Sequence, residues 1–314
     1  MKRILITGAN GQIGSELRET LVSQLGSENV VSIDLSRPSG YDAKKLGALE
    51  LVDVTDKQAM QNVVEAYRID TIFHLVGILS AKGERNPDLA WDVNVNSLKY
   101  ILDFAREKKL RIFWPSSIAV FGPTSPKQQT PQTTPLEPTS MYGVTKVAGE
   151  LLCNYYFNKY QVDVRSLRFP GLISYKTPPG GGTTDYAVEI FYEALKSNAY
   201  TSFLRADTVL PMMYMPDAIR AILELMTSPA QNLTVRTSYN LTAISFSVQE
   251  IAAEIQKYLS EFKLNIDPDQ RQQIADSWPR TIDDSVARRD WHWRHKYDLA
   301  AMTKDMLENL QARL

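Results

Sequence analysis

The chain has 314 residues, a length that allows one large domain or two intimately joined ones. Lysine and arginine number 35 and aspartate and glutamate 36, so the net charge is −1, with no basic surplus for binding nucleic acid non-specifically. Hydrophobic residues make up 44% and charged residues 23%, which excludes a disordered or collagen-like chain.

Cysteine and histidine are scarce. Cys153 is the single cysteine, and the three histidines are His74, His292 and His295, so neither an internal disulfide nor a cluster with metal-ligand spacing can form. No apolar run reaches the roughly 20 residues that span a bilayer, and the segment Met1–Gly8 reads as a strand rather than a signal peptide. We therefore expect a cytoplasmic protein with no metal site and no membrane or nucleic-acid partner.

The first half of the sequence alternates short β-branched runs with longer amphipathic patterns, as in βαβ units whose parallel sheet is covered on both faces. Six strands are expected at Arg3–Thr7, Val30–Asp34, Leu49–Asp53, Thr71–Val76, Arg111–Ser116 and Asp163–Arg168. The helical stripes between them lie at Gln12–Leu25, Lys57–Tyr67 and Pro87–Lys108. Six strands and five crossovers predict an α/β protein with a doubly wound parallel Rossmann sheet.

The pattern changes after Arg168. The segment Tyr175–Thr184 is rich in proline, glycine and threonine, and further helices are expected at Tyr186–Lys196, Ser247–Phe262 and Leu299–Leu310. We predict a first domain of residues 1–171 and a smaller, mixed lobe of residues 172–314. Because no linker separates the two parts, we expect them to interlock, with the lobe returning a strand or helix to the first domain.

A glycine-rich turn joins the first expected strand to the first helix. Gly8, Gly11 and Gly14 have the spacing G-x-x-G-x-x-G, which lets the backbone approach a pyrophosphate at a helix amino terminus. A purely steric need for glycine in the turn is the alternative. Asp34 ends the second strand 20 residues after Gly14, where a carboxylate can accept both ribose hydroxyls and repel a 2′-phosphate. NAD is thus favoured over NADP, although Arg37 lies nearby.

A tyrosine and a lysine stand four residues apart in the segment Tyr142-Gly143-Val144-Thr145-Lys146. On a helix they share one face, so the lysine charge favours the phenolate and makes Tyr142 a candidate general acid or base. A surface pair is the alternative. Ser116 and Ser117 end the fifth expected strand, and active groups of a parallel sheet gather at the carboxyl ends of its strands. Ser117 is therefore placed to bond a substrate oxygen.

These motifs together resemble the extended short-chain dehydrogenase/reductase family over essentially the whole chain. The resemblance implies that Ser117, Tyr142 and Lys146 form a catalytic triad and that Asn94 braces the site, although a solvent-facing Asn94 is the alternative. It also implies that residues 1–171 are the NAD-binding domain and residues 172–314 the substrate-binding lobe. The further cofactor residues that we expect are Gln12, Ile13, Asp53, Val54, Leu75, Val76, Gly77 and Pro170. A helix cap is an equal alternative for Asp53.

Four separated stretches are similar to the short-chain family of L-threonine 3-dehydrogenases, at 79–84, 164–171, 182–187 and 211–217. Between Leu172 and Pro216 only Lys176, Lys196 and Arg205 are basic, which leaves few cations for holding a substrate diphosphate. The resemblance implies oxidation of the L-threonine β-hydroxyl to 2-amino-3-oxobutanoate with NAD. The implied substrate residues are Ser80, Ser116, Ser117, Tyr142, Gly180, Thr183, Thr184 and Trp278. The alternatives are a surface connection for the glycine-rich loop and core packing for Trp278.

Two other functions stay open at this point. A sugar-nucleotide epimerase or dehydratase would reduce NAD only transiently, and a non-catalytic NAD-sensing module would not need the serine, tyrosine and lysine together. The resemblance further implies a homodimer packed through the helices near Pro87–Lys108 and Met141–Gln161.

Overall fold

The computed structural model describes residues 1–313, and its largest element is a seven-stranded sheet in the order β10-β6-β5-β4-β1-β2-β3. The pairs β2·β3, β1·β2, β1·β4 and β4·β5 are parallel, so the predicted α/β class and Rossmann sheet are confirmed. The strands are β1 (Ile4–Thr7), β2 (Val30–Asp34), β3 (Ala48–Leu51), β4 (Thr71–His74), β5 (Arg111–Ser117), β6 (Val164–Phe169) and β10 (Tyr239–Asn240). The short β10 was not predicted, because two residues carry no periodic signal.

Helices follow the strands as the alternating pattern predicts. The longer ones are α1 (Gln12–Leu25), α3 (Lys57–Ala66), α6 (Ser97–Lys108) and α7 (Met141–Tyr160), and the short ones are α2 (Ala43–Leu46), α4 (Ser80–Arg85) and α5 (Pro87–Trp91). Single-turn 3₁₀ segments lie at Ser27–Asn29, Ile118–Val120 and Ala230–Asn232. The continuous helix expected over Pro87–Lys108 is wrong: a π-helical turn at Asp92–Asn96 separates α5 from α6. Such turns often mark functional sites.

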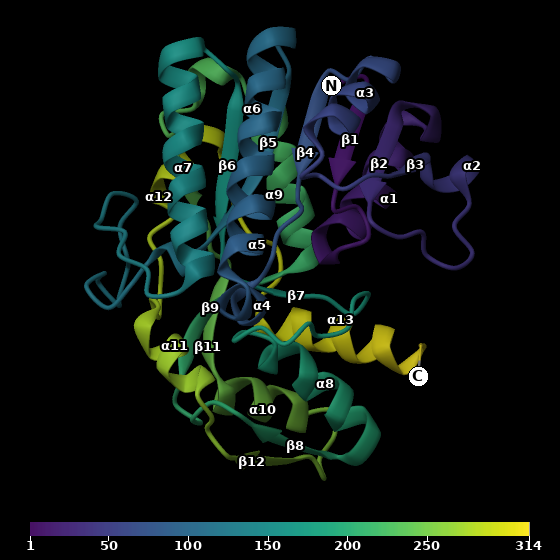
Figure 1. Ribbon diagram of the computed structural model, residues 1–314. Helices are drawn as coiled ribbons and strands as arrows, with labels where there is room; N and C mark the ends of the chain where they lie inside the picture. Colours follow the sequence, from purple (N-terminus) through teal and green to yellow (C-terminus); the bar gives the residue numbers. More distant parts are fainter. Residues whose placement is uncertain (314) are drawn as a thin grey trace. The chain divides into compact units, whose positions relative to one another are not determined.

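Helices α6 and α7 stand side by side along β5 and β6 (Figure 1). Their shared core contains Leu98, Trp114 and Cys153, all nearly or completely buried. Gly149 brings α7 close to the sheet, since a Cβ there would lie 2.3 Å from the Trp114 ring. The start of α7, which carries Tyr142, is thereby held against the carboxyl end of β5.

A second group of elements forms around a three-stranded sheet in the order β11-β9-β7, in which β11 (Ile244–Ser247) is antiparallel and β7 (Gly171–Ile173) parallel to β9 (Val209–Tyr214). Strands β8 (Ala199–Ser202) and β12 (Lys263–Ile266) make a further parallel pair. The helices are α8 (Tyr186–Ser197), α9 (Met215–Thr227), α10 (Val248–Gln256), α11 (Arg271–Ser277), α12 (Ser285–Trp291) and α13 (Leu299–Gln311). Of these, α8, α10 and α13 pack together (Figure 1). The helix expected to continue to Phe262 ends at Gln256.

The chain separates into two compact units, each made of several segments. The first unit comprises residues 1–116, 140–167 and 222–239, and the second comprises residues 117–139, 168–221 and 240–314. The chain therefore passes between the units several times, since the segments 117–139 and 222–239 each belong to a different unit from the residues on both sides of them.

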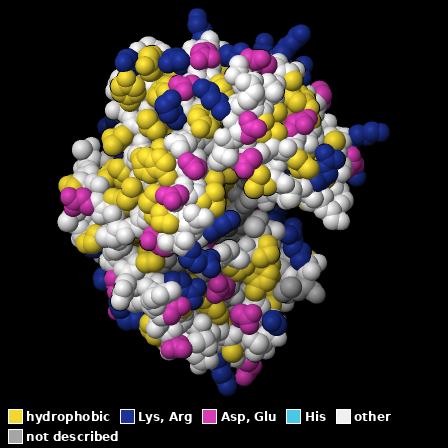
Figure 2. Space-filling model, viewed as in Figure 1, with side chains coloured by type: hydrophobic (Ala, Val, Ile, Leu, Met, Phe, Trp, Pro, Cys, Tyr) yellow, Lys and Arg dark blue, Asp and Glu magenta, His cyan; other side chains and the backbone are white. Residues whose placement is uncertain are grey.

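One surface of α7 is unusually apolar for an exposed helix. Val144, Leu151 and Tyr155 are 41%, 60% and 48% exposed, and Figure 2 shows hydrophobic side chains gathered over this helix. Trp91, at the end of α5, is also 40% exposed. Among residues 1–313, no helix combines the length and apolarity needed to cross a membrane.

Candidate cofactor site and active site

The glycine turn after β1 leaves no room for a side chain at Gly8 or Gly14. Gly8 has a φ of +68°, and a Cβ there would lie 2.8 Å from the backbone nitrogen of Val76. A Cβ on Gly14 would lie 2.2 Å from the carbonyl oxygen of Gly8. The N-cap of α1 is Gly11, and no side chain caps the helix, whose first residues are Gln12 and Ile13. A cradle of this shape at a helix amino terminus fits a pyrophosphate.

Asp34 ends β2 and is tied to the glycine turn. Its carboxylate accepts hydrogen bonds from the backbone N–H groups of Asn10, at 2.9 Å, and Leu35, at 2.8 Å. A carboxylate only accepts hydrogen bonds, so this position suits a ribose with two hydroxyls and repels a 2′-phosphate. The nearby guanidinium of Arg37 donates to the carbonyl of Leu49 at 3.2 Å.

Asp53 and Val54, two of the expected cofactor residues, lie just after β3, which ends at Leu51 and not at Asp53 as predicted. The Asp53 carboxylate accepts from the backbone N–H of Thr55 at 2.9 Å and from its hydroxyl at 2.8 Å. Helix α3 is capped instead by Asp56, whose side chain accepts from the N–H of Ala59. The capping alternative for Asp53 is therefore excluded, and its contact with the cofactor stays a prediction.

Asn94 lies in the π-helical turn and braces the segment after β4 that contains Leu75, Val76 and Gly77. Its side-chain oxygen accepts from the N–H of Ile78 at 2.7 Å, and its amide donates to the Ile78 carbonyl at 3.1 Å and to Thr145 Oγ1 at 3.0 Å. Asn94 is 2% exposed, which excludes the solvent-facing alternative. One side chain thus joins the backbone beside the glycine turn to α7.

Tyr142 and Lys146 share one face of α7, where Lys146 Nζ lies 5.5 Å from the centroid of the Tyr142 ring. Ser140 fixes the start of the helix, since its hydroxyl accepts from the N–H of Gly143 at 3.1 Å. The Lys146 ammonium donates to the carbonyl of Pro115 at 2.6 Å and lies 4.5 Å from the centroid of the Trp114 ring. Lys146 is 4% exposed, so it is not half of a surface pair.

Burial changes the acid–base chemistry of Lys146. Loss of solvent lowers the pKa of its ammonium to about 7, and the neighbouring acidic groups of Cys153 and Glu150 oppose this effect. A lysine that gains and loses its proton near neutral pH beside a tyrosine is an arrangement suited to proton transfer.

The two predicted serines differ in their surroundings. Ser116 is buried, and its hydroxyl donates to Glu150 Oε1 at 2.7 Å. Ser117 is the last residue of β5, and its hydroxyl accepts from the N–H of Ala119 at 3.2 Å, which still leaves its own hydrogen as a donor. Ser117 is the better placed of the two to bond a substrate, because the hydroxyl hydrogen of Ser116 is already donated to Glu150 on α7.

His74 was not among the predicted site residues, although it ends β4 beside the glycine turn. Its Nδ1 lies 2.9 Å from Thr7 Oγ1 and its Nε2 2.8 Å from Ser97 Oγ. The Ser97 hydroxyl donates to the carbonyl of Val93, so Nε2 carries the hydrogen that bonds Ser97, and Nδ1 accepts from Thr7. Burial, and to a lesser extent the charge of Lys146, lowers the pKa of His74 to about 3. A single histidine in an apolar strand gave no sequence signal for this role.

The glycine-rich loop before α8 is organised by a residue that the sequence analysis did not single out. Asp185 Oδ2 accepts from three consecutive backbone N–H groups, those of Gly180 and Gly181 at 2.7 Å and of Gly182 at 2.9 Å. Thr183 is buried, and Thr184 packs closely on Gly171, where a Cβ would lie 2.8 Å from the Thr184 Cβ. The loop is thus a closed turn.

The other predicted residues are placed as follows. Ser80 is the first residue of α4, which contacts the start of α7 through the bond from the N–H of Met141 to Glu84 Oε1 at 2.6 Å. Pro170 is buried between β6 and β7, and Trp278 directly follows α11 and is 8% exposed. The substrate contacts of these residues stay predictions.

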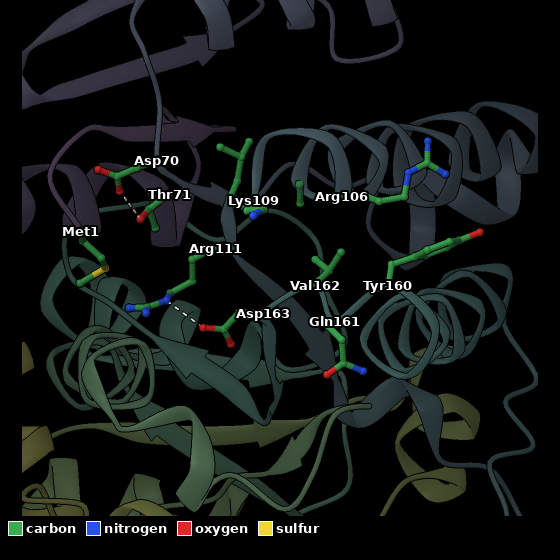
Figure 3. A pocket seen from close by; sticks show the side chains of 12 residues that line it. Met1, Asp70, Thr71, Arg106, Lys109, Arg111, Tyr160, Gln161, Val162 and Asp163 are labelled. Atoms are coloured by element: carbon green, nitrogen blue, oxygen red, sulfur yellow. Dashed lines mark hydrogen bonds and ion pairs between the residues drawn. The ribbon is translucent and has the colours of Figure 1, made fainter.

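A cavity of about 510 Å³ lies elsewhere on the first unit (Figure 3). Its lining includes Asp70, Thr71, Arg111 and Asp163, which stand where β4, β5 and β6 begin. Arg111 and Asp163 are paired at 2.9 Å, and Asp70 accepts from Thr71 Oγ1 at 2.6 Å. None of the predicted site residues lines this cavity. Because parallel sheets bind ligands at the carboxyl ends of their strands, it is not the candidate site.

A parallel sheet with a glycine turn after its first strand and an acidic residue after its second defines a dinucleotide-binding protein. The family model for the NAD dependent epimerase/dehydratase family matches residues 4–241. The chain belongs to this family; it is an enzyme of this class, and NAD is its cofactor.

Full-length relatives are similar to the whole chain. An uncharacterized epimerase/dehydratase of Staphylococcus saprophyticus is 51% identical over 314 residues, covering 100% of this chain and 98% of that protein. The structure of L-threonine dehydrogenase from Clostridium difficile is 51% identical with a TM-score of 0.97, covering 100% of this chain and 98% of the other. A monomeric L-threonine 3-dehydrogenase from a metagenome is 45% identical with a TM-score of 0.95, covering 99% of both chains.

Proposed function

We propose that the enzyme oxidises the β-hydroxyl of L-threonine to 2-amino-3-oxobutanoate with NAD. The observation that carries the proposal is the likeness to L-threonine dehydrogenases, which extends over the whole chain at 51% identity and includes the lobe that would select the substrate. The pairing of the half-buried Tyr142 with the buried Lys146 supports an oxidoreductase, because alcohol oxidation needs a base for the hydroxyl proton.

In this proposal Tyr142 takes the proton from the threonine hydroxyl. The charge of Lys146, 5.5 Å from the centroid of the tyrosine ring, favours the phenolate form that does so. Ser117 donates a hydrogen bond that holds the substrate oxygen. General-base catalysis of this kind contributes roughly 10²–10⁴-fold, and positioning contributes further.

When bound, NAD would supply the hydride acceptor. Gly8, Gly11 and Gly14 would hold its pyrophosphate, Asp34 its adenosine ribose, and Asn94 would keep the neighbouring backbone in place. Thr183 and Thr184, with Ser80, would supply hydroxyl donors for the amino-acid carboxylate, Gly180 would border the site with its own N–H bonded to Asp185, and Trp278 would form part of the pocket wall.

The test is NADH absorbance after the protein is mixed with NAD and either L-threonine, L-serine, L-allo-threonine or a UDP-sugar. We expect NADH to accumulate preferentially with L-threonine. A Tyr142→Phe variant that still binds NAD is the matched control and should form none. If no amino acid yields NADH, the threonine assignment is wrong. Conversion of the UDP-sugar without net NADH would then identify an epimerase, and inertness with all of them a non-catalytic NAD sensor.

We also propose that the protein is a cytoplasmic homodimer. The exposed side chains of Val144, Leu151 and Tyr155 on α7, together with Trp91, form the apolar face expected of a helical interface. A relative that is 45% identical is described as monomeric, so identity at this level does not decide the oligomeric state. Light scattering of the protein and of a Leu151→Glu variant should give the mass of a dimer and of a monomer, respectively.

A further inference from the structure

Helix α7 holds the end of β5 at two consecutive residues. Lys146 Nζ donates to the carbonyl oxygen of Pro115 at 2.6 Å, and Glu150 Oε1 accepts from the hydroxyl of Ser116 at 2.7 Å. Lys146 and Glu150 are one helical turn apart, and residues at this spacing are neighbours on a helix. Their exposed fractions are only 4% and 1%, and that of Ser116 is 2%. Ser117, the next residue along β5, is the proposed substrate-binding serine.

Among the described residues that act on the charge of Lys146, Glu150 carries a carboxyl group. Tyr142, Glu150 and Cys153 approach it from α7, His74 from β4, and the Trp114 ring and Pro115 carbonyl from β5. Burial raises the pKa of the Cys153 thiol, which is therefore uncharged near neutral pH. Burial also keeps His74 neutral, since its pKa falls to about 3. Glu150 is thus the group among these whose carboxylate opposes the effect of burial on Lys146.

A buried ammonium is costly unless an opposite charge accompanies it. Burial lowers the pKa of Lys146 to about 7, so a large share of the molecules would carry a neutral lysine at slightly alkaline pH. A neutral lysine cannot favour the Tyr142 phenolate. Any group that holds the proton on Lys146 therefore determines how much of the enzyme is in the productive protonation state.

We propose that Glu150 is a positioning residue whose carboxylate raises the protonated share of Lys146 beside Tyr142 and whose bond to Ser116 fixes α7 against the end of β5. The inference rests on the proposed function for the pairing of Tyr142 with Lys146. It does not depend on which alcohol the enzyme oxidises.

The first test measures Lys146 directly, by a pH titration of the lysine side-chain ε-carbon signals in NMR spectra of the full chain labelled with ¹³C-lysine. A Lys146→Arg variant identifies the signal. In Glu150→Gln, which keeps an oxygen to accept from Ser116 but loses the charge, we expect the pKa of Lys146 to fall by about one unit, a tenfold loss of proton affinity. Glu254→Gln removes another mostly buried carboxylate, on α10, and should leave this pKa unchanged.

Ser116→Ala distinguishes the effect of the Glu150 charge from the effect of its hydrogen bond to Ser116. It also provides a test if Glu150→Gln does not fold. It removes the hydroxyl but keeps the carboxylate, so the pKa of Lys146 should stay the same or rise. A fall of about one unit in Ser116→Ala, or an unchanged value in folded Glu150→Gln, would overturn the inference.

The second test is the pH profile of kcat/KM for L-threonine. Without the Glu150 charge, the Tyr142–Lys146 pair should lose its first proton at lower pH, so the acid limb of the profile should move to lower pH. More of that proton should come from Lys146 and less from Tyr142. Fewer molecules then carry the Tyr142 phenolate beside a charged lysine, and the plateau of kcat/KM should fall. A residue with a packing role alone would lower the plateau without moving the limb. If the wild type does not oxidise threonine, the proposed function fails while the NMR titration still decides the role of Glu150.

Discussion

The close approach of α1 to β1 gives a quantitative prediction for Gly14→Ala. The added Cβ would start 2.2 Å from the Gly8 carbonyl oxygen, and since real Cβ atoms essentially never come within 3.0 Å, the backbone must move by at least 3.0 − 2.2 = 0.8 Å. Overpacking of this kind costs about 1–3 kcal/mol, and the better helix propensity of alanine returns up to about 1 kcal/mol. We therefore expect a net loss of roughly 1–2 kcal/mol in the free energy of unfolding, and weaker NAD binding because the cradle shifts.

The matched control is Gly11→Ala in the same turn. A Cβ there would lie 3.2 Å from the Gly8 oxygen, which the turn can accommodate by moving a few tenths of an ångström. Gly11→Ala should cost up to about 1 kcal/mol, because alanine is a poorer N-cap than glycine, and it should weaken NAD binding because its methyl group occupies the approach of the pyrophosphate. Urea unfolding without cofactor and calorimetric NAD titration measure both quantities. If Gly14→Ala unfolds at the same urea concentration as the wild type, the close helix–strand contact does not exist as described.

Three further predictions concern single residues. Tyr142→Phe should lower kcat by about 10²-fold or more with NAD affinity little changed, whereas an unaltered kcat would assign the base elsewhere. Asn94→Ala leaves the Ile78 N–H without its partner, so it should destabilise the protein by about 1–3 kcal/mol and lower the affinity for NAD. Urea unfolding and calorimetric NAD titration measure the two effects. His74 has a folded pKa of about 3, below its unfolded value of 6.5, so the unfolded chain binds the extra proton and stability should fall by about 2 kcal/mol from pH 7 to pH 5. The pH slope of urea stability should be flatter in His74→Gln.

The sheet was predictable because its strands are short, buried on both faces and bounded by polar residues. The limits of β2 and α1 agree with the predicted ones residue for residue, since Asp34 and the glycine turn mark them clearly. The π-helical turn at Asp92–Asn96 was not predictable in the same way. The apolar periodicity of the sequence continues through residues 92–96 without a break. The bonds that Asn94 makes from this turn, to Ile78 and Thr145, join residues that are distant in the sequence, so no local pattern indicates them.

In the candidate site, too, contacts between residues close in the sequence could be predicted, and contacts between distant residues could not. Tyr142 and Lys146 are four residues apart, so helical geometry alone placed them together. Ser116 and Glu150 lie 34 residues apart, and their contact depends on Gly149, which lets α7 come down onto Trp114. In the sequence, Ser116 looked like a second substrate-binding hydroxyl, and Glu150 looked like one more charge on a helix.

The chemistry of Lys146 follows from that distant packing and not from the local pattern. A Y-x-x-x-K pair on an exposed helix would have an ordinary lysine, charged throughout the physiological range. Here the approach of α7 to β5 removes water from the ammonium and lowers its pKa to about 7, while the same approach brings the Pro115 carbonyl beside it and buries Glu150, one turn further along α7. In the proposed mechanism, Gly149, which permits the approach, Glu150, which opposes its cost, and Lys146, which acts on Tyr142, therefore form one functional unit. Substitution of Gly149 should consequently alter the titration of Lys146 although residue 149 carries no ionisable group.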